Sequence, residues 1–452
     1  MTPIKRIFIA NRGEIAVRVI RTARALGIET VLGVSEADRD SLGAQLATRA
    51  VCLGPAAATE SYLKVETVVQ AALGTGCDAI HPGYGFLSEN RALAEACAKE
   101  GLIFIGPDPA NLEAVGDKLT ARTHAENAKV PLVPGGTVDT VEEALELSER
   151  VGYPMLIKAV SGGGGRGMKR VDRAEDLPGQ LDLAISEATA AFGDGRVYLE
   201  RYVRVGRHVE VQIISDGTTV LHAGERDCSI QRRYQKVVEE APAPELPEKL
   251  RQGVLQAATD FARHIGYRSL GTVEFLVDVE REEFYFLEMN ARVQVEHPVT
   301  EAITGLDLIA TQIAIAEGRP LDITQGDIIL SGHAIECRLN AEDIDNDFMP
   351  SPGRVTQVWF PSMPGLRVDS HMQPGAMISP YYDSMIAKLI TWAPTRAQAI
   401  DRMQDALRVV SLEGLKTNAP LHAAIMDDDI FGKGGVDTGY LPDLLTRLEE
   451  SQ

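Results

Sequence analysis

One stretch of the sequence carries a polar side chain at every second position. Glu288, Asn290, Arg292, Gln294 and Glu296 follow directly on an aromatic and apolar run. Because side chains alternate faces in an extended chain, these five should point the same way, with the residues between them turned toward a core. Carboxylate and amide oxygens are the ligands that Mg²⁺ prefers, and Arg binds planar oxyanions through two nitrogens. The pattern predicts a site for a metal and an anion with Glu296 as a candidate base, rather than a half-buried strand with a solvated face.

A glycine-rich loop lies between two expected strands upstream of this row. Four consecutive glycines occupy 162–165, with Lys158 before them and Arg166 after them. The exposed N–H groups of such a loop can bind phosphates. The loop is not a Walker A motif, because no Gly-Lys-Ser/Thr opens a helix. An unstructured hairpin tip is the alternative, but the flanking cations favour contact with phosphate.

Three further features could contribute to such a site. The segment 226–236 is dense in cations and runs into an apolar sequence, which favours an anion-binding channel over a solvated surface. Glu274 lies on an expected strand, 272–278, and could pair with Glu288 across neighbouring strands. The turn 81–90 contains two glycines around Tyr84, which suits tight packing and ligand approach equally well. A lone Arg in a strand is usually structural, so pattern alone gives Arg338 no role.

Composition narrows the classes of function. The chain has 452 residues, enough for two to four domains, and a net charge of -20, which argues against a nucleic-acid partner. The five Cys are odd in number and contain no Cys-x-x-Cys, so reduced thiols and a cytoplasmic location are expected. No signal segment and no run long enough to span a membrane are apparent, so no membrane partner is expected.

The elements that would position these residues begin as an alternation of strands and helices. Strands are expected at 4–10, 30–34, 79–80 and 102–105, and helices at 14–26, 62–73 and 91–99. Such alternation predicts a parallel α/β sheet, and the absence of Gly-x-Gly-x-x-Gly gives no sign of dinucleotide binding. A new unit begins near 116, an apolar helix is expected at 302–316, and short strands and turns from 332 predict a third, α+β unit.

Several long motifs resemble biotin carboxylase, a member of the ATP-grasp superfamily. The matching segments are Lys158–Met168, Glu225–Pro244, Glu288–Glu301, His81–Asn90, Gly332–Asp343 and Pro380–Met385, and the resemblance covers nearly the whole chain. It implies a mixed α/β and α+β fold in three parts. These are an N-terminal Rossmann-like parallel α/β domain at 1–114, an ATP-grasp region at 115–325 with a mobile lid at about 132–203, and a C-terminal α+β domain at 332–446.

The resemblance also implies a reaction. The family uses ATP, Mg²⁺ (or Mn²⁺) and bicarbonate to carboxylate biotin on a carrier protein through carboxyphosphate, as a component of a carboxylase such as acetyl-CoA carboxylase. The implied partners are a biotin carboxyl carrier protein, carboxyltransferase subunits and a second copy of the chain in a homodimer. Two alternatives are an ATP-grasp carboxylate ligase with another acceptor and an inactive ATP-binding regulatory module.

Matching the motifs residue by residue gives each candidate a role. The resemblance implies nucleotide and phosphate contacts at Lys118, Lys158, Gly164, Gly165, Met168, Glu200, Arg201, Tyr202, Val203, His208, Gln231, Tyr234, Glu274, Leu276 and Glu288. It implies metal ligands at Glu274, Glu288 and Asn290, and bicarbonate or biotin contacts at Tyr84, Lys236, Arg292, Gln294, Val295 and Arg338. The implied catalytic residues are Lys236, Arg292, the base Glu296, and Arg338, which stabilises the biotin enolate.

The sequence departs from the family pattern in two places. Tyr234 stands near the ribose, where many members have His, and Ala25 replaces the acidic partner of Arg21 in a dimer contact. The family's carrier domain presents biotin on a Lys between two Met, and no Met-Lys-Met occurs in these residues. Biotin is therefore expected to arrive on a separate carrier.

Overall fold

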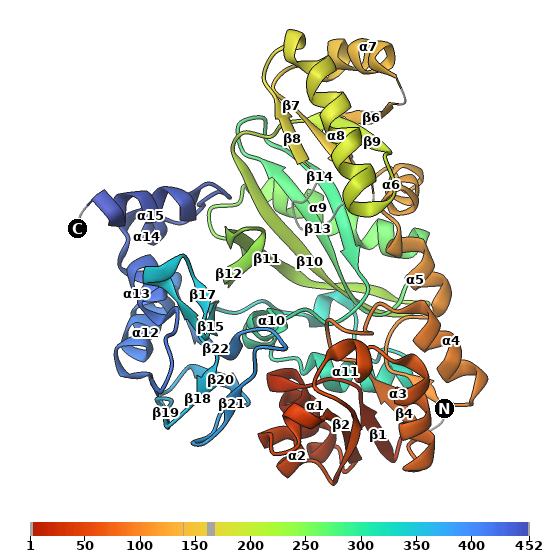
Figure 1. Cartoon of the computed structure of the whole chain (residues 1–452), viewed down its shortest axis with the longest axis vertical. Coiled ribbons are helices and arrows are strands. Elements are labelled where there is room, and N and C mark those ends of the chain that lie inside the picture. Colours follow the sequence, from red (N-terminus) through yellow and green to blue (C-terminus); the bar gives the residue numbers. More distant parts are fainter. Residues whose placement is uncertain (1–2, 139, 161–167, 451–452) are drawn as a thin grey trace.

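The computed structural model describes residues 3–138, 140–160 and 168–450. They form three units and one long sheet, which runs from the middle of the chain into the C-terminal unit (Figure 1). In the view of Figure 1 the N-terminal unit lies at the bottom, the unit that contains β6 to β9 lies at the top, and the C-terminal unit lies at the left.

The N-terminal unit is a parallel sheet with helices on both faces. Its strands are β1 (Arg6–Ile9), β2 (Glu29–Ser35), β3 (Arg49–Gly54), β4 (Ala79–His81) and β5 (Ile103–Phe104), and its helices are α1 (Gly13–Ala25), α2 (Leu42–Leu46), α3 (Val65–Gly74), α4 (Arg91–Lys99) and α5 (Pro109–Gly116). The order β3-β2-β1-β4-β5, with every pair parallel, confirms the predicted parallel α/β sheet. Strand β3 was not predicted; it is a largely exposed edge strand with only a short apolar run at 50–53.

Alternation along β1 explains why helices cover both faces of this sheet. Ile7 and Ile9 pack with Ile15 of α1, whereas Phe8 points the other way and packs with Val68 of α3. Burial of both faces is typical of parallel sheets, whose crossover helices lie above and below.

An eight-stranded antiparallel sheet connects the middle of the chain to the C-terminal unit. It is built from β10 (Gly206–Asp216), β11 (Val220–Arg232), β12 (Gln235–Ala241), β13 (Arg268–Asp278), β14 (Glu283–Asn290), β15 (His333–Asn340), β20 (Leu366–Ser370) and β22 (Met385–Ala393). The strand order is β14-β13-β10-β11-β12-β15-β22-β20. Because β12 pairs with β15, residues from the middle and from the C-terminal third of the sequence share one surface.

A smaller antiparallel sheet projects from this assembly. It contains β6 (Gly135–Val138), β7 (Met155–Ala159), β8 (Met168–Val171) and β9 (Val197–Arg201) in the order β6-β9-β7-β8. Helices α7 (Val141–Val151) and α8 (Leu177–Phe192) lie with it at the top of Figure 1. Helix α6 (Lys118–Asn127) precedes it, and α9 (Glu248–His264) packs on the long sheet against β10 and β11.

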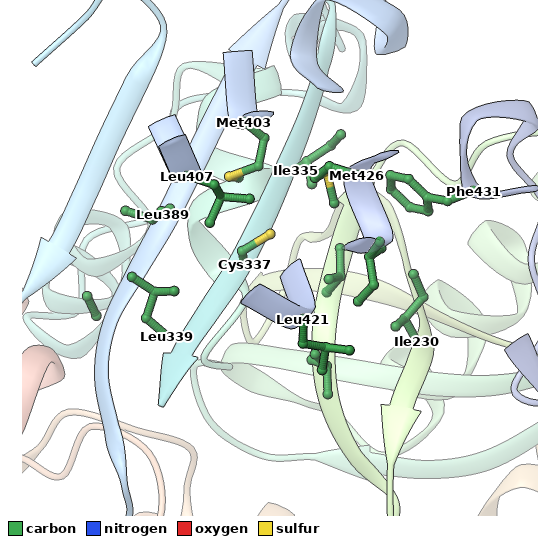
Figure 2. Packing of buried hydrophobic residues seen from close by; sticks show 14 of the residues in the cluster. Ile230, Ile335, Cys337, Leu339, Leu389, Met403, Leu407, Leu421, Met426 and Phe431 are labelled. Carbon is green, nitrogen blue, oxygen red and sulfur yellow. The ribbon is translucent and has the colours of Figure 1, made fainter. Parts of the chain in front are cut away.

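The C-terminal unit packs helices on one face of the long sheet. Its helices are α12 (Arg396–Val409), α13 (Ala419–Asp427), α14 (Asp429–Lys433) and α15 (Tyr440–Glu450), and its short strands are β16 (Glu342–Asp343), β17 (Met349–Pro350), β18 (Gly353–Arg354), β19 (Gln357–Trp359), β21 (Met377–Ile378) and β23 (Ser411–Glu413). Figure 2 shows Cys337 and Leu389 from the sheet packed against Met403 and Leu421 from helices. This core holds the outer strands of the sheet in place.

The apolar helix expected at 302–316 is two helices. Helix α10 (His297–Thr304) ends before Gly305, which has a φ of 74°, and α11 (Leu308–Ala316) starts after Asp307, whose carboxylate caps Ala310 N. A left-handed glycine followed by an acidic N-cap ends one helix and begins another. Within the described residues, no single helix is long and apolar enough to cross a membrane; α10 and α11 pass that test only as a pair, bent by 99°.

Candidate active site

A cavity of about 710 Å³ lies where the N-terminal unit meets the long sheet. It is lined by a subset of the residues predicted from the sequence, namely Tyr84, His208, Tyr234, Lys236, Glu274, Glu288, Asn290, Arg292, Gln294, Val295 and Arg338. Not among its lining residues are Lys118, Lys158, Met168, Glu200, Arg201, Tyr202, Val203, Gln231, Leu276 and Glu296. Gly164 and Gly165 lie outside the described residues.

Two carboxylates face each other at one end of this cavity. Glu274 of β13 and Glu288 of β14 are paired in the sheet register, just before a bulge in the ladder. Burial raises the pKa of Glu288, and the nearby charge of Glu274 raises it further. Glu288 accepts a hydrogen bond from Asn290 Nδ2 at 3.1 Å. An oxygen-lined pair of this kind suits a divalent cation, which would relieve the repulsion between the two carboxylates.

The polar row does not continue as a strand, which corrects the sequence prediction. Strand β14 ends at Asn290, and residues 291–296 form an irregular segment that leads into α10. Hydrogen bonds nevertheless bring several of its side chains together. Arg292 donates to Asn290 Oδ1 at 2.6 Å and to Gln294 Oε1 at 2.7 Å, and Gln294 Nε2 donates to Glu274 Oε1 at 3.2 Å. The row is therefore held as a network at the end of the strand.

Lys236 of β12 joins the two ends of the cavity. Its Nζ lies 2.5 Å from Glu210 Oε2, 3.0 Å from Glu274 Oε1 and 2.7 Å from Glu296 Oε1. Burial alone would lower the pKa of Lys236, but the three carboxylates outweigh it and hold that pKa well above its usual value. Lys236 is therefore a charged ammonium, and its hydrogen bonds can shift from one anionic group to another.

Glu296 and Arg338 form the other end of the site. Glu296 is fully buried at the start of α10, and its Oε2 lies 3.0 Å from Arg338 Nη2. Burial would raise the pKa of Glu296, but Lys236 and Arg338 outweigh it and hold the pKa well below its usual value. The second contact of Arg338 runs from its Nε to Glu239 Oε1 at 2.6 Å. Burial and the Glu296 charge raise the pKa of Glu239 to about 7.

The predicted nucleotide contacts lie between the small sheet and the long sheet. Lys158 of β7 forms an ion pair with Glu200 of β9. Next along the chain, Arg201 Nη1 donates to the Tyr285 hydroxyl at 3.3 Å, and the Tyr202 ring lies beneath the Arg170 guanidinium at 4.6 Å. Lys158 and Arg201 lie on β7 and β9, the two central strands of the small sheet, and Arg201 connects β9 to β14 through Tyr285.

Apolar and polar groups continue this surface toward the carboxylates. Val203 and Leu276 belong to one apolar cluster, and Met168 pairs with Lys158 across β7 and β8. His208 contacts Gln231 Nε2 at 2.8 Å and Glu274 Oε2 at 2.9 Å. Lys118 begins α6, and its charge acts on Glu288. Among the predicted nucleotide residues, His208 contacts Glu274, and the charge of Lys118 acts on Glu288.

Only part of the cation-dense segment reaches the cavity. Arg226 is fully buried and donates to Glu210 at 2.6 Å, while Arg232 and Arg233 both pair with Asp347 at 2.9 Å. These cations already serve as partners for protein carboxylates. From this segment the cavity is lined by Lys236 together with Tyr234 and Gln235, of which Lys236 alone is charged.

Several residues of this neighbourhood were missed from the sequence. Glu210 follows His208 by two positions on one face of β10, so the same alternation that identified Glu288 could have identified it. Glu89 accepts from Ala291 N at 3.0 Å and from Arg292 Nε at 2.9 Å, and a single Glu in a turn gives no signal of this. Lys388 was missed because it is a single charge in an apolar strand, β22, and Glu14 because it does not stand out among the other charged residues of α1.

Models of known protein families match three consecutive parts of the chain. Residues 3–112 match "Biotin carboxylase, N-terminal domain", 117–324 match "Carbamoyl-phosphate synthase L chain, ATP binding domain", and 336–443 match "Biotin carboxylase C-terminal domain". The chain belongs to the biotin carboxylase family. It is 50% identical over 442 residues to a biotin carboxylase of Nostoc sp., covering 97% of this chain and 99% of that one. Biotin carboxylase 1 of Bacillus subtilis is 48% identical, with coverage of 97% and 98%.

Solved biotin carboxylase structures have the same fold. The β,γ-ATP complex from Campylobacter jejuni is 45% identical, with a TM-score of 0.92 over 98% of this chain and 99% of that one. The biotin carboxylase domain dimer of Hydrogenobacter thermophilus 2-oxoglutarate carboxylase, in complex with MgADP, ADP and bicarbonate, has a TM-score of 0.91 at 44% identity and 98% coverage of both chains. The family and the mixed fold predicted from the sequence are confirmed, and the chain is an ATP-dependent carboxylase.

Proposed function

We propose that this biotin carboxylase uses ATP, Mg²⁺ or Mn²⁺, and bicarbonate to carboxylate biotin that is attached to a carrier protein. The observation that carries the proposal is the position of Lys236, which contacts both Glu274 of the carboxylate pair and the candidate base Glu296. One cavity is therefore lined by metal-binding oxygens and an anion-binding cation, and the candidate base contacts that cation directly. The alternative ligase and the inactive module have no observation in their favour.

We infer that Glu274 and Glu288 hold the metal ion. The two carboxylates fit Mg²⁺, whose protein ligands are usually one or two carboxylates completed by phosphate oxygens and water. Asn290 is the third proposed ligand, although its Oδ1 accepts from Arg292 at 2.6 Å and Gln294 at 2.8 Å. The bound ion would neutralise charge on the transferring phosphoryl group. Lys118 and Lys158 are positioned to bind the same phosphates, with the segment 200–203 and His208, Gln231, Tyr234 and Leu276 around the rest of the nucleotide.

Bicarbonate is proposed to lie among Lys236, Arg292, Gln294 and the backbone at Val295. Arg292 can bind it through two nitrogens, and Lys236 can take up its negative charge. Glu296, which is ionised in this setting, would accept the bicarbonate proton as the oxygen attacks the γ-phosphate of ATP. ADP leaves and carboxyphosphate forms, which then releases CO₂ and phosphate.

Biotin is proposed to meet this CO₂ beside Tyr84 and Arg338. The phosphate released from carboxyphosphate can accept the N1′ proton of biotin, after which N1′ attacks CO₂ to give carboxybiotin. Loss of the proton puts negative charge on the ureido oxygen, and a guanidinium is a suitable partner for it. Arg338 lines the cavity and stays charged, since Glu239 and Glu296 hold its pKa above the usual value.

The remaining predictions concern domains and partners. We propose the domain limits 1–114, 115–325 and 332–446, with a lid at about 132–203, and a cytoplasmic enzyme that works with a biotin carboxyl carrier protein and carboxyltransferase subunits. Dimer formation is supported by the dimer named for the Hydrogenobacter relative. The larger assembly is supported by Rhizobium etli pyruvate carboxylase, a chain of which the match covers 41%. Arg21 lines a second cavity with Arg18 and Arg367, and we propose this face as the dimer contact.

The test is to measure ADP release by the purified protein with ATP and Mg²⁺, first alone, then with bicarbonate, and then with free biotin or a biotinylated carrier. We expect bicarbonate to be required, free biotin to act weakly, and the carrier to act strongly, because tethering raises the effective concentration of biotin. Labelled bicarbonate should give acid-labile label on the carrier. Release of ADP that ignores bicarbonate, or label on this chain without a carrier, would contradict the proposal.

A further inference from the structure

The backbone N–H and C=O groups of the irregular segment 291–296 need hydrogen-bond partners. In a strand, the neighbouring strands would supply them. Buried carbonyl and N–H groups are almost always paired. Here side chains from elsewhere supply part of the pairing. Glu89 accepts from Ala291 N at 3.0 Å, and His297 Nδ1 lies 2.7 Å from Gln294 O. Lys388 Nζ donates to Val295 O at 2.7 Å.

Lys388 is a fully buried cation that does not line the cavity. It lies on β22, directly opposite Arg338 of β15, so both side chains project from the same face of the sheet. Burial would lower the pKa of Lys388, but Glu14, Glu336 and Asp369 outweigh it and raise that pKa. A charged donor to a backbone carbonyl is stronger than a neutral one, and its direction is fixed by the rigid strand that carries it.

The second contact of Lys388 leads to the biotin side of the site. Its Nζ lies 3.1 Å from Glu14 Oε1, and the same oxygen accepts the hydroxyl of Tyr84. Tyr84 and Val295 line the cavity. The Lys388 ammonium thus contacts the peptide bond that precedes Glu296. Through the Glu14 carboxylate it is also connected to Tyr84, whose ring is proposed to face biotin.

We propose that Lys388 is a positioning residue for the carboxylation reaction, a role that rests on the proposed function. Its ammonium fixes the peptide bond between Val295 and Glu296, and so sets the direction of the base and of the bicarbonate pocket. Through Glu14 it also fixes Tyr84. Lys388 touches no reacting atom, so its effect passes through these neighbours. If Lys388 served only as a counter-ion for Glu14, it would be needed only while Glu14 is charged.

The two roles are separated by removing the charges singly and together. Lys388→Met leaves Glu14 buried without its cation, so the main variant is Lys388→Met combined with Glu14→Gln, which removes the charge of Glu14 as well and keeps an acceptor for Tyr84. If that pair does not fold, Lys388→Gln with Glu14→Gln replaces the ion pair by two amides, and the shorter side chain ends before Val295 O. Glu14→Gln alone keeps the Lys388–Val295 hydrogen bond.

A matched control lies far from the cavity. Arg251 resembles Lys388 in contacts: its Nε lies 2.9 Å from the buried Glu225 Oε1, and its Nη2 donates to Ala243 O at 2.8 Å. Arg251→Met with Glu225→Gln therefore removes the same kinds of interaction at a place that touches no proposed substrate.

We expect the KM for bicarbonate in ATP cleavage to rise about tenfold or more in the folded double variant, from loss of a charge-assisted hydrogen bond. The KM for ATP of the double variant should stay within about twofold, because Lys388 contacts Glu14 and Val295, which are not proposed to bind the nucleotide. Glu14→Gln alone should keep the bicarbonate KM, because it keeps the Lys388–Val295 hydrogen bond. The Arg251 control should change neither constant. A wild-type bicarbonate KM in the folded double variant, or an equal rise in Glu14→Gln or in the control, would overturn the inference.

A second measurement does not depend on catalysis. Hydrogen exchange at the amides of 295–297 should be faster in the double variant than in the wild type, and unchanged in the Arg251 control. Unchanged exchange would overturn the positioning role even if the wild type proved inactive. A wild type that cleaves ATP without needing bicarbonate would instead overturn the proposed function, so the two failures are distinguishable.

Discussion

Replacing Lys236 by Met removes a cation that Glu210, Glu274 and Glu296 share. Each carboxylate keeps another partner: Arg226 lies 2.6 Å from Glu210, His208 lies 2.9 Å from Glu274, and Arg338 lies 3.0 Å from Glu296. Losing one partner of a buried pair costs about 3–5 kcal/mol when the other charge is left alone. Since no carboxylate is left alone here, we expect Lys236→Met to cost about 3 kcal/mol and to fold, because native stability is about 5–15 kcal/mol.

The main effect should be on the base. An opposite charge close to a carboxylate lowers its pKa by about one to three units, so removal of Lys236, with Arg338 still present, should raise the pKa of Glu296 by about one to two units. Each unit corresponds to about 1.4 kcal/mol. Because the folded pKa of Glu296 is depressed, its ionisation stabilises the fold above the unfolded pKa, and this stabilisation is lost as the pH falls through the folded pKa. Lys236→Met raises the folded pKa, so the loss on acidification begins at a higher pH.

The assay is bicarbonate-dependent ATP cleavage measured against pH. In Lys236→Met we expect the acid limb of the profile to move up by about one to two units, together with a lower maximal rate from the lost bicarbonate contact. Lys416→Met is the control, because Lys416 also contacts two carboxylates, Asp343 and Asp345 at 3.3 Å, but on the exposed surface. An acid limb that does not move in Lys236→Met, or that moves equally in the control, would refute the electrostatic role of Lys236.

Three other predictions test separate parts of the site. Glu288→Gln removes a charge from the carboxylate pair, so turnover should fall by about a hundredfold or more, and full activity at saturating Mg²⁺ would exclude Glu288 as a ligand. Arg338→Met should impair carboxybiotin formation more than bicarbonate-dependent ATP cleavage, and equal losses in both assays would contradict that division. Tyr234→His should change the KM for ATP by less than about threefold, since Tyr234 is 60% exposed on a hairpin turn. A larger change would show that the tyrosine contacts the nucleotide.

Periodicity predicted the parts of the fold that are buried and regular. The N-terminal strands and helices that were predicted lie close to where apolar spacing placed them, because a parallel sheet covered on both faces leaves a strong apolar signal. The helices α2 and α5 were not predicted. Strand β3 escaped because it is an exposed edge, and the break between α10 and α11 escaped because apolar residues continue on both sides of it. Gly305 and Asp307 mark this break, but a prediction based on apolar composition alone passes over them.

The candidate site was predicted better than the element that carries it. The polar row was expected to converge because strand side chains alternate, yet the strand ends at Asn290. The side chains of Arg292 and Gln294 still meet, because they hydrogen-bond to Asn290 and to Glu274. Lys388 could not be predicted in this way. Its partner is a backbone carbonyl 93 positions away, and no spacing rule identifies such a pair.

The cations proposed to meet bicarbonate and biotin are already paired with carboxylates of the protein. Lys236 contacts Glu296, Arg292 contacts Glu89 at 2.9 Å, and Arg338 contacts Glu239 and Glu296. The chain has a net charge of -20, and such pairing keeps these three cationic side chains from turning toward other carboxylates of the protein. A bicarbonate ion must therefore share or replace these partners.

This exchange of partners has a consequence for the base. Lys236 and Arg338 hold the pKa of Glu296 well below its usual value, which makes the carboxylate ionised but weakly basic. When the charge of Lys236 turns toward bicarbonate, the pKa of Glu296 must rise, because the strongest cause of its depression is shared with another anion. A base is most effective when its pKa approaches the working pH. Arrival of the substrate would therefore increase the basicity of Glu296 at the moment when a proton is available for it to accept.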